Sequence, residues 1–214
     1  MVRIAGQDSA LTRYRARLRR ARIIYATVLA TLAAVVVTTV SIVWSRGEIA
    51  HTSLRTARTP APATPLVLPS AHQTLAWRSG DHAAMGNPFW RGTVVTFGRH
   101  AVRGRVARTG AITWSYTRTD RTVCTAAQTQ GATVVVYRDS GNCDELTALD
   151  SGTGARRWTR TLDEDGMPVN GTPRVTVTPG TALLQTVMVT AASVIYAIDP
   201  ASGIDRWTFH QPGC

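Results

Sequence analysis

The sequence predicts an all-β domain of about three repeated units, preceded by a single N-terminal transmembrane helix. Two observations carry this prediction. An eleven-residue pattern occurs at 148–158 and again at 197–207: Ala, Asp two residues later, a hydroxyl–Gly pair, and Trp four residues after the Gly. Residues 23–44 form a 22-residue run without a charged side chain. The repeat predicts the architecture of the domain, and the apolar run predicts a membrane anchor.

The apolar run and its flanks predict the topology of the chain. At about 1.5 Å per residue, a helix over 23–44 spans the hydrocarbon core of a bilayer, which is about 30 Å thick. The preceding tail, residues 1–22, carries seven Arg against one acid, Asp8. This positive charge places the tail in the cytoplasm and everything after Trp44 outside. The sequence therefore predicts a single-pass protein of the plasma membrane.

A cleaved signal peptide is the main alternative, ahead of a buried core helix, because it also begins with basic residues and continues with apolar ones. The run is long for such a segment, and the residues at its end, 41–46, are too bulky for an ordinary cleavage site. An uncleaved anchor is therefore favoured. No cysteine near the end of the run could carry a lipid.

A Pro-rich segment, residues 45–73, follows the apolar run. It contains Pro60, Pro62, Pro65 and Pro69. Prolines at this density favour an extended, semi-rigid chain. We expect a spacer between the membrane and a folded domain over residues 74–214.

The repeat has a third, weaker copy at 104–114, in which Val106 stands where the other copies have Asp. The tryptophans of the copies recur at roughly 45 residues, the period of a propeller blade; they are Trp114, Trp158 and Trp207. Three unrelated hairpins with similar turns are the alternative. The identical internal spacing of the two best copies argues against it.

Each copy is typical of a strand, a tight turn and a second strand. The carboxylates of Asp150 and Asp199 can accept hydrogen bonds from backbone amides of their own turns. One glycine per turn allows a positive φ angle without a steric clash; these glycines are Gly110, Gly154 and Gly203. The tryptophan then opens the next strand.

The rest of the domain is also predicted to be strands. β-Branched and apolar runs bounded by glycines and polar turns occur at 93–97, 133–137 and 182–189. No segment after residue 70 has helical periodicity. We therefore predict a partial β-propeller of about three blades.

The spacing Ala-x-Asp-x-x-x-Gly-x-x-x-Trp, with Thr or Ser before the Gly, resembles the tryptophan-docking motif of PQQ-like β-propeller repeats. The resemblance covers roughly residues 92–214. It implies that the three repeat tryptophans pack between blades, and that Trp77 belongs to a partial repeat. It does not imply a bound quinone. The quinoprotein dehydrogenases of this superfamily are longer and use adjacent cysteines and an acidic calcium site, which this sequence lacks, so we expect no cofactor and no catalysis.

Three units are fewer than the about four to eight blades that close a propeller. The chain could be a truncated version of a longer propeller, it could oligomerise to close a ring, or it could be an open stack. An exposed sheet edge favours aggregation, so the first two explanations are preferred. The sequence favours truncation, because it stops at a repeat boundary.

Cys124 and Cys143 flank the predicted strand 133–137 and could form a disulfide within one unit. An extracytoplasmic compartment allows such a bond to persist. Cys214 would then be the first cysteine of a fourth, missing unit. Three unpaired cysteines are the alternative. No Cys-x-x-Cys pair occurs, so a zinc site is not expected.

The charge distribution argues against nucleic-acid binding. The net charge is +11, of which residues 1–58 hold +8 and the domain only +3. The basic charge is therefore concentrated near the membrane, where anionic lipids attract it.

The sequence indicates no metal or catalytic site. The five histidines are scattered, and the acidic segment 163–166 is more typical of a solvated turn than of a calcium loop.

These observations predict a non-catalytic binding or scaffold module whose partners are the membrane and an envelope protein or glycan. The alternatives are a fragment of a quinone-dependent oxidoreductase and a truncated, non-functional product. Envelope propellers that assist outer-membrane assembly share the repeat but are lipoproteins. The missing lipidation cysteine argues against membership of that group.

Overall fold

The computed structural model describes residues 25–42, 47–63, 75–86, 89–139, 141–164, 167–168, 173–177, 186–191 and 194–210. These residues belong to two compact units, Met1–Ala50 and His51–Cys214. The predictions for the Arg-rich tail, for Trp44 and for Cys214 lie outside the described residues.

The first unit contains the helix Tyr25–Ile42, the one helix of the described chain that is long and apolar enough to cross a membrane. All of its side chains are exposed. The hydroxyls of Thr31, Thr38 and Thr39 each donate to the backbone carbonyl four residues earlier, at 2.8–3.0 Å. These polar groups are thus satisfied inside the helix itself. The short helix α2 (Glu48–His51) follows it in the chain.

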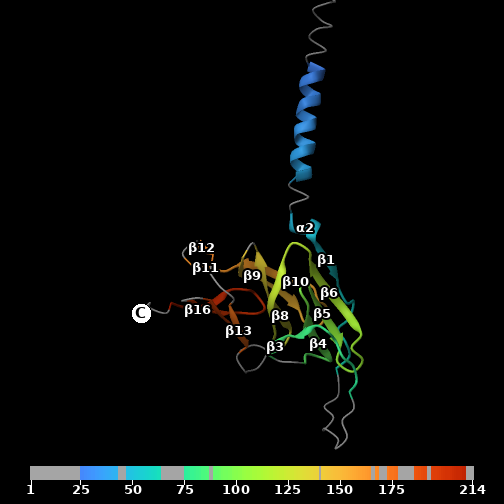
Figure 1. Cartoon of the computed structure of the whole chain (residues 1–214), viewed down its shortest axis with the longest axis vertical. Helices are drawn as coiled ribbons and strands as arrows, with labels where there is room; N and C mark the ends of the chain where they lie inside the picture. The colour runs from blue at the N-terminus through green and yellow to red at the C-terminus, as the bar shows by residue number, and fades with distance from the viewer. Residues whose placement is uncertain are drawn as a thin grey trace, which may run out of the picture. The chain divides into compact units, whose positions relative to one another are not determined.

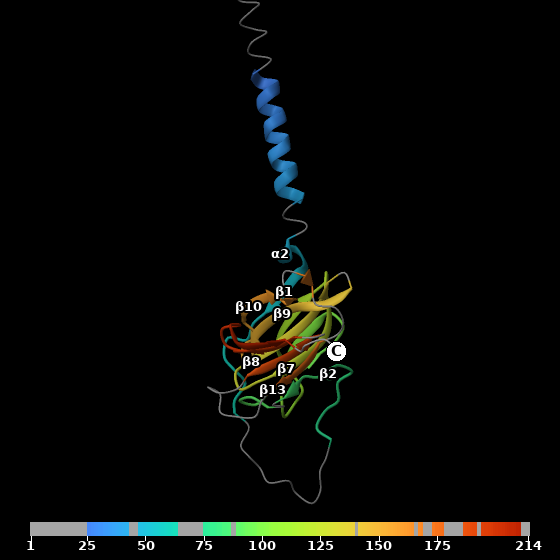
Figure 2. The ribbon, with the colours of Figure 1, turned by 90° about the vertical axis from the view of Figure 1, so that its left-hand side faces the viewer.

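The second unit is made of β-sheets (Figures 1 and 2). The first sheet has the order β1-β6-β5-β4-β2, with β1 (Thr52–Arg55), β2 (His82–Ala83), β4 (Thr93–Phe97), β5 (Ala101–Val106) and β6 (Ile112–Arg118). The second has the order β10-β9-β8-β7-β3, with β3 (Met85–Gly86), β7 (Thr122–Gln128), β8 (Ala132–Asp139), β9 (Asn142–Asp150) and β10 (Arg156–Thr161).

The third sheet has the order β13-β14-β15-β16, with β13 (Arg174–Val177), β14 (Val187–Ala191), β15 (Val194–Ile198) and β16 (Asp205–His210). A small hairpin, β11 (Asp163–Glu164) with β12 (Met167–Pro168), connects the second sheet to the third along the chain. Strand pairs are antiparallel except β3 with β7, which are parallel. The predicted fold class, three blade-sized β-sheets after one apolar helix, is confirmed.

The sheets pack against one another in chain order, with an apolar core at each interface. Strand β8 lies between them: Val135 and Tyr137 belong to the core with the first sheet, and Val134 and Val136 to the core with the third. Because both faces of β8 are covered, its sequence is a continuous apolar run rather than an alternating pattern.

Part of the segment assigned to the linker is folded. Residues Thr52–Arg55 form β1 and pair with β6 as the outer strand of the first sheet. The amide of Ala57 donates to the carbonyl of Thr153, in the turn between β9 and β10, at 2.9 Å, and Ala61 is buried. The prediction that folded structure begins near residue 74 is therefore wrong. A four-residue, largely exposed edge strand leaves too short a pattern to be recognised beside the prolines.

Candidate functional site

The contact between Trp114 and Gly154 joins the first sheet to the second. Trp114 is fully buried, and its Nε1–H donates to the carbonyl of Ser151 at 3.0 Å. The ring lies on Gly154, where an added Cβ would stand 2.6 Å from Cδ2 of the indole. On the other side, the ring also covers Gly104, its cross-strand partner in β5. Residues without side chains therefore make the space that the tryptophan occupies.

The second and third sheets are joined in the same way. Trp158 donates from Nε1–H to the carbonyl of Pro200 at 3.2 Å, and its ring lies on Gly203. As at the first interface, the accepting carbonyl belongs to the residue after the Asp of the repeat. Arg160, two residues beyond the tryptophan, binds both carboxylate oxygens of Asp205 at 2.7 and 3.0 Å. A docked indole and an ion pair thus cross this interface together.

Trp77 makes the docking contact from a segment that precedes the three repeats. Its Nε1–H donates to the carbonyl of Ala107 at 2.7 Å, and its ring lies on Gly110, whose φ is +72°. Residues 75–79 that carry it are not a strand. The resemblance implied that Trp77 belongs to a partial repeat, but the sequence did not show which turn its indole contacts. The number of residues between the tryptophan and the turn that it contacts differs at each interface.

The aspartates of the repeat hold the docking turns in shape. Oδ1 of Asp150 accepts hydrogen bonds from the amides of Gly152 and Thr153 at 3.0 and 2.9 Å, and Oδ2 binds Arg157 at 2.7 Å. Asp199 repeats this arrangement in the third sheet. Burial raises the pKa of both carboxyls, but the arginine and the turn amides outweigh it and hold each pKa below its ordinary value. Both groups are therefore ionised near neutral pH.

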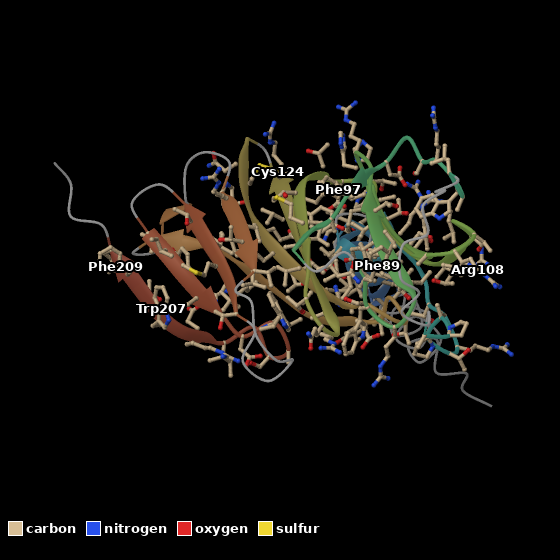
Figure 3. The ribbon with its side chains drawn as sticks, turned by 90° about the horizontal axis from the view of Figure 1, so that it is seen from below. Phe89, Phe97, Arg108, Cys124, Trp207 and Phe209 are labelled. Carbon is tan, nitrogen blue, oxygen red and sulfur yellow. A yellow bond between two sulfur atoms is a disulfide. The ribbon has the colours of Figure 1, made fainter. Side chains whose placement is uncertain are left out.

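Trp207, the third repeat tryptophan, makes no docking contact within the part of the chain that the structure describes. It lies opposite Ala197 in the β15–β16 pair, yet half of the side chain, 50%, is exposed. Figure 3 shows Trp207 and Phe209 together on the outermost strand of the third sheet. The docking expected at Trp114 and Trp158 is therefore present, whereas the described residues include no docking partner for Trp207.

A buried charge cluster also crosses the first interface. Arg118, only 2% exposed, binds Glu145 of β9 and Asp120, each at 2.8 Å. Its guanidinium lies 5.8 Å from the ring centroid of Tyr137. Desolvation opposes the charge, but the hydrogen bond from Arg118 to Asp120 and the charge of Glu145 raise the pKa of Arg118 above its usual range. Sequence reasoning missed this cluster, because nothing in the sequence indicates which distant acid an arginine will meet.

Cys124 and Cys143 are joined by a disulfide. Cys124 is the extra residue of a β-bulge in β7, between two residues that pair with adjacent positions of β8. The bulge turns its side chain across the end of β8 towards β9. Beside it lies an open cavity of about 340 Å³, lined by Arg99, Thr122, Val123, Cys124 and Arg138.

The described residues do not include the adjacent cysteines or the acidic calcium site that the quinoprotein dehydrogenases of this superfamily use. The two bonded cysteines are 19 residues apart rather than adjacent. In the described ranges, no group of three or more His, Cys, Asp or Glu side chains could hold a metal ion. The cavity beside the disulfide is lined by two arginines and no acid.

Similar solved structures cover part of the chain. They include BamB from Moraxella catarrhalis (20% identity, TM-score 0.41, 56% of this chain and 34% of that one) and a europium-containing methanol dehydrogenase (18%, 0.43, 60% and 31%). A third is the quinohemoprotein alcohol dehydrogenase from Comamonas testosteroni (16%, 0.44, 56% and 26%). The chain spans about a third or less of the length of each. No curated protein matches it.

A family model described as "Outer membrane protein assembly factor BamB" matches residues 70–211. The expectation that the chain stands outside this group of envelope propellers is therefore wrong. That expectation rested on the absence of a lipidation cysteine, which concerns the N-terminal segment, whereas membership follows from the repeats. With its turns, docked tryptophans and sheets in place, the chain belongs to the family of PQQ-type repeat proteins described as outer membrane protein assembly factor BamB.

Proposed function

We propose that this chain is a membrane-anchored, extracytoplasmic propeller module that binds a protein or glycan partner in the cell envelope and catalyses no reaction. The observation that carries the proposal is the family match over residues 70–211, downstream of a helix able to cross a membrane. The family is described as an assembly factor, a description that favours binding over chemistry.

The helix Tyr25–Ile42 supports the membrane anchor. None of its side chains is buried against protein, and its threonine hydroxyls are satisfied by its own backbone. A helix of this kind is stable in hydrocarbon, where no water is present to bind polar groups. The seven arginines of residues 1–22 favour a cytoplasmic N-terminus.

The disulfide supports an extracytoplasmic domain. A bond between Cys124 and Cys143 persists in an oxidising compartment and is rare in the cytosol. The arginines of the tail favour a domain outside the cytoplasm. The disulfide is stable in that same compartment, so the two observations agree.

The docked sheets support a binding role. Indole contacts and the ion pairs of Arg118 and Arg160 fix each sheet to the next. The loops between strands are thereby held on a rigid framework. Surfaces that are ordered before binding lose less conformational entropy when a partner arrives.

Labelling of single cysteines in intact cells tests the topology. In the full chain with Cys214→Ser, a cysteine in place of exposed Arg108 should react with a membrane-impermeant maleimide. A cysteine in place of Ser9 should react only after the cells are permeabilised. Labelling at position 9 alone in intact cells would reverse the proposed orientation.

A binding assay with the quinone tests the absence of catalysis. The full chain in detergent, mixed with PQQ and calcium, should show no saturable quenching of tryptophan fluorescence beyond that of a denatured control. Saturable binding at one quinone per chain would instead support the alternative, a fragment of a quinone-dependent oxidoreductase.

A further inference from the structure

The two cysteines of the disulfide differ in their exposure. Cys143 belongs to the apolar core between the second and third sheets and is 1% exposed. Cys124 is half-buried and lines the open cavity of about 340 Å³. A small molecule that enters this cavity therefore approaches the disulfide from the side of Cys124.

The cavity lies beside a part of β7 that has no partner strand on that side within the described chain. Strand β3 pairs with β7 only at Ala127 and Gln128, so the first residues of β7, among them the bulge at Cys124, are left uncovered by a strand. The amide of Val123 donates to the carbonyl of Arg99 at 2.8 Å. This hydrogen bond fixes the turn that carries Arg99 beside the start of β7.

Two arginines of different sheets give the cavity a positive charge. Arg99 follows β4 of the first sheet, and Arg138 belongs to β8 of the second. Neither forms an ion pair within the described residues, whereas Arg121, the residue before β7, binds Glu145 at 3.1 Å. No acid is among the described residues that line the cavity. Such a cavity attracts an anion.

One of these arginines also contacts the buried sulfur. Nη2 of Arg138 donates to Sγ of Cys143 at 3.6 Å. When a disulfide is attacked at one sulfur, the other sulfur leaves as a thiolate. A guanidinium beside Cys143 stabilises the negative charge that would develop there. Exposure and charge thus favour the same direction of cleavage, with attack at Cys124 and departure of Cys143.

We propose that the Cys124–Cys143 disulfide is a site of thiol–disulfide exchange, attacked at Cys124 by a small anionic thiol that enters the cavity. The thiolate of the reagent donates an electron pair to Sγ of Cys124 and forms a mixed disulfide. The bond to Cys143 breaks, and its electron pair leaves on Sγ of Cys143, which then takes up a proton from water.

A second molecule of the thiol completes the reduction. Its thiolate attacks the reagent sulfur of the mixed disulfide, so the reagent leaves oxidised as its own disulfide, and Cys124 is released as a thiolate that is protonated by water. This reaction modifies the chain and is separate from the proposed binding of a partner. Because the bond joins β7 to β9 across β8, its reduction would loosen the second sheet.

Thiols that share the skeleton HS–CH2–CH2 and differ in charge test the proposal. The full chain with Cys214→Ser, in an uncharged detergent, is treated with anionic 2-mercaptoethanesulfonate, neutral 2-mercaptoethanol or cationic cysteamine. Rates of bond opening are compared per thiolate. The anionic reagent should react about tenfold faster than the cationic one at low salt, and about 1 M salt should largely remove this preference. Acid quenching and mass spectrometry of peptides should place the first adduct on Cys124.

Substitutions separate the roles of the two arginines. Cysteamine reacts as a thiolate without net charge, so its rate depends little on attraction into the cavity. Arg99→Gln should weaken the preference for the anionic reagent and leave the cysteamine rate nearly unchanged. Arg138→Gln should slow cysteamine as well, by about threefold to tenfold, because the leaving sulfur loses its cation. Arg138→Lys, which keeps the charge, should retain most of the rate.

Arg108→Gln is the matched control. It makes the same change of charge at an exposed residue that lies apart from Cys124 (Figure 3), and it should leave all rates unchanged. The melting temperature of each oxidised variant checks its folding.

Three results would overturn the proposal: a first adduct on Cys143, equal rates for the three thiols at low salt, or a bond that opens only in denaturant. The proposed binding of an envelope partner would stand in each case. The thiol series on the unsubstituted arginines decides the matter even where an arginine variant fails to fold.

Discussion

The indole of Trp114 lies on the α-carbon of Gly154, and its N–H binds the carbonyl three residues before that glycine. The same relationship links Trp158 to Gly203. Each contact joins one sheet to the turn of the next, so the second unit is held together by nearest-neighbour interfaces. The stability of this unit should therefore depend on each docked tryptophan and little on an undocked one.

Trp114→Ala should destabilise the second unit by about 3–5 kcal/mol, because it empties a fully buried site between two sheets. Trp207→Ala should change the free energy of unfolding by no more than about 0.5 kcal/mol, because half of that side chain is already in water. Denaturant unfolding of residues 51–214 measures both. Equal losses in the two variants would contradict the docking interpretation.

Gly154→Ala should also be strongly destabilising. The new Cβ would stand 2.6 Å from Cδ2 of Trp114, at a residue whose φ is +76°. Steric overlap and the unfavourable backbone conformation together should cost about 2–4 kcal/mol. Gly80→Ala is the control, since nothing lies within 4 Å of its added Cβ. A mild effect at Gly154 would mean that the ring can move away without loss.

Arg118→Met should cost about 2–4 kcal/mol, because Glu145 and Asp120 lose their 2%-exposed counterion and keep only the more exposed Arg121. The matched control is Arg157→Met, which removes an ion pair with Asp150 whose two side chains are about 30% exposed. That exposed pair should be worth no more than about 1 kcal/mol. Thermal unfolding of both variants distinguishes the buried cluster from ordinary surface charge.

Acid should weaken the second unit through four aspartates: Asp81, Asp120, Asp150 and Asp199. Their folded-state pKa values lie below the ordinary value, despite burial, because arginines bind all four carboxylates and turn amides also bind those of Asp150 and Asp199. A depressed pKa stabilises the fold above a pH of about 4, and this contribution is lost as the pH falls through the folded-state pKa. The melting temperature should therefore fall between about pH 5 and pH 2, and less steeply in Asp150→Asn.

The sequence predicted those features that depend on local pattern. The turn chemistry of Asp150 and Gly154 and the spacing to Trp158 were sufficient to predict three blade-sized units. The pattern could not show which turn each tryptophan reaches, because that depends on how far the chain travels between sheets. It therefore suggested the same environment for Trp114 and Trp207, although one is fully buried and the other half exposed.

Features that depend on distant pairing were not predicted. Strand β1 is four residues long and pairs with a strand about 60 residues later, so its sequence resembles a linker. The ion pair of Arg118 and Glu145 joins two strands of different sheets. Charged residues at such positions look like solvent-exposed ones in the sequence, since burial is set only when the sheets pack.

The disulfide offers a test of covalent state and stability together. Cys124 and Cys143 are 19 residues apart, with Cα atoms 6.2 Å apart in the folded chain. Closing a loop of this length should stabilise the domain by about 3 kcal/mol on the chain-entropy account. Cys124→Ala with Cys143→Ala should remove that amount, whereas Cys214→Ser should change stability little.

Alkylation of unreduced protein, followed by mass spectrometry, should modify one thiol, at Cys214. Three modified cysteines, or a bond between Cys124 and Cys214, would contradict the pairing.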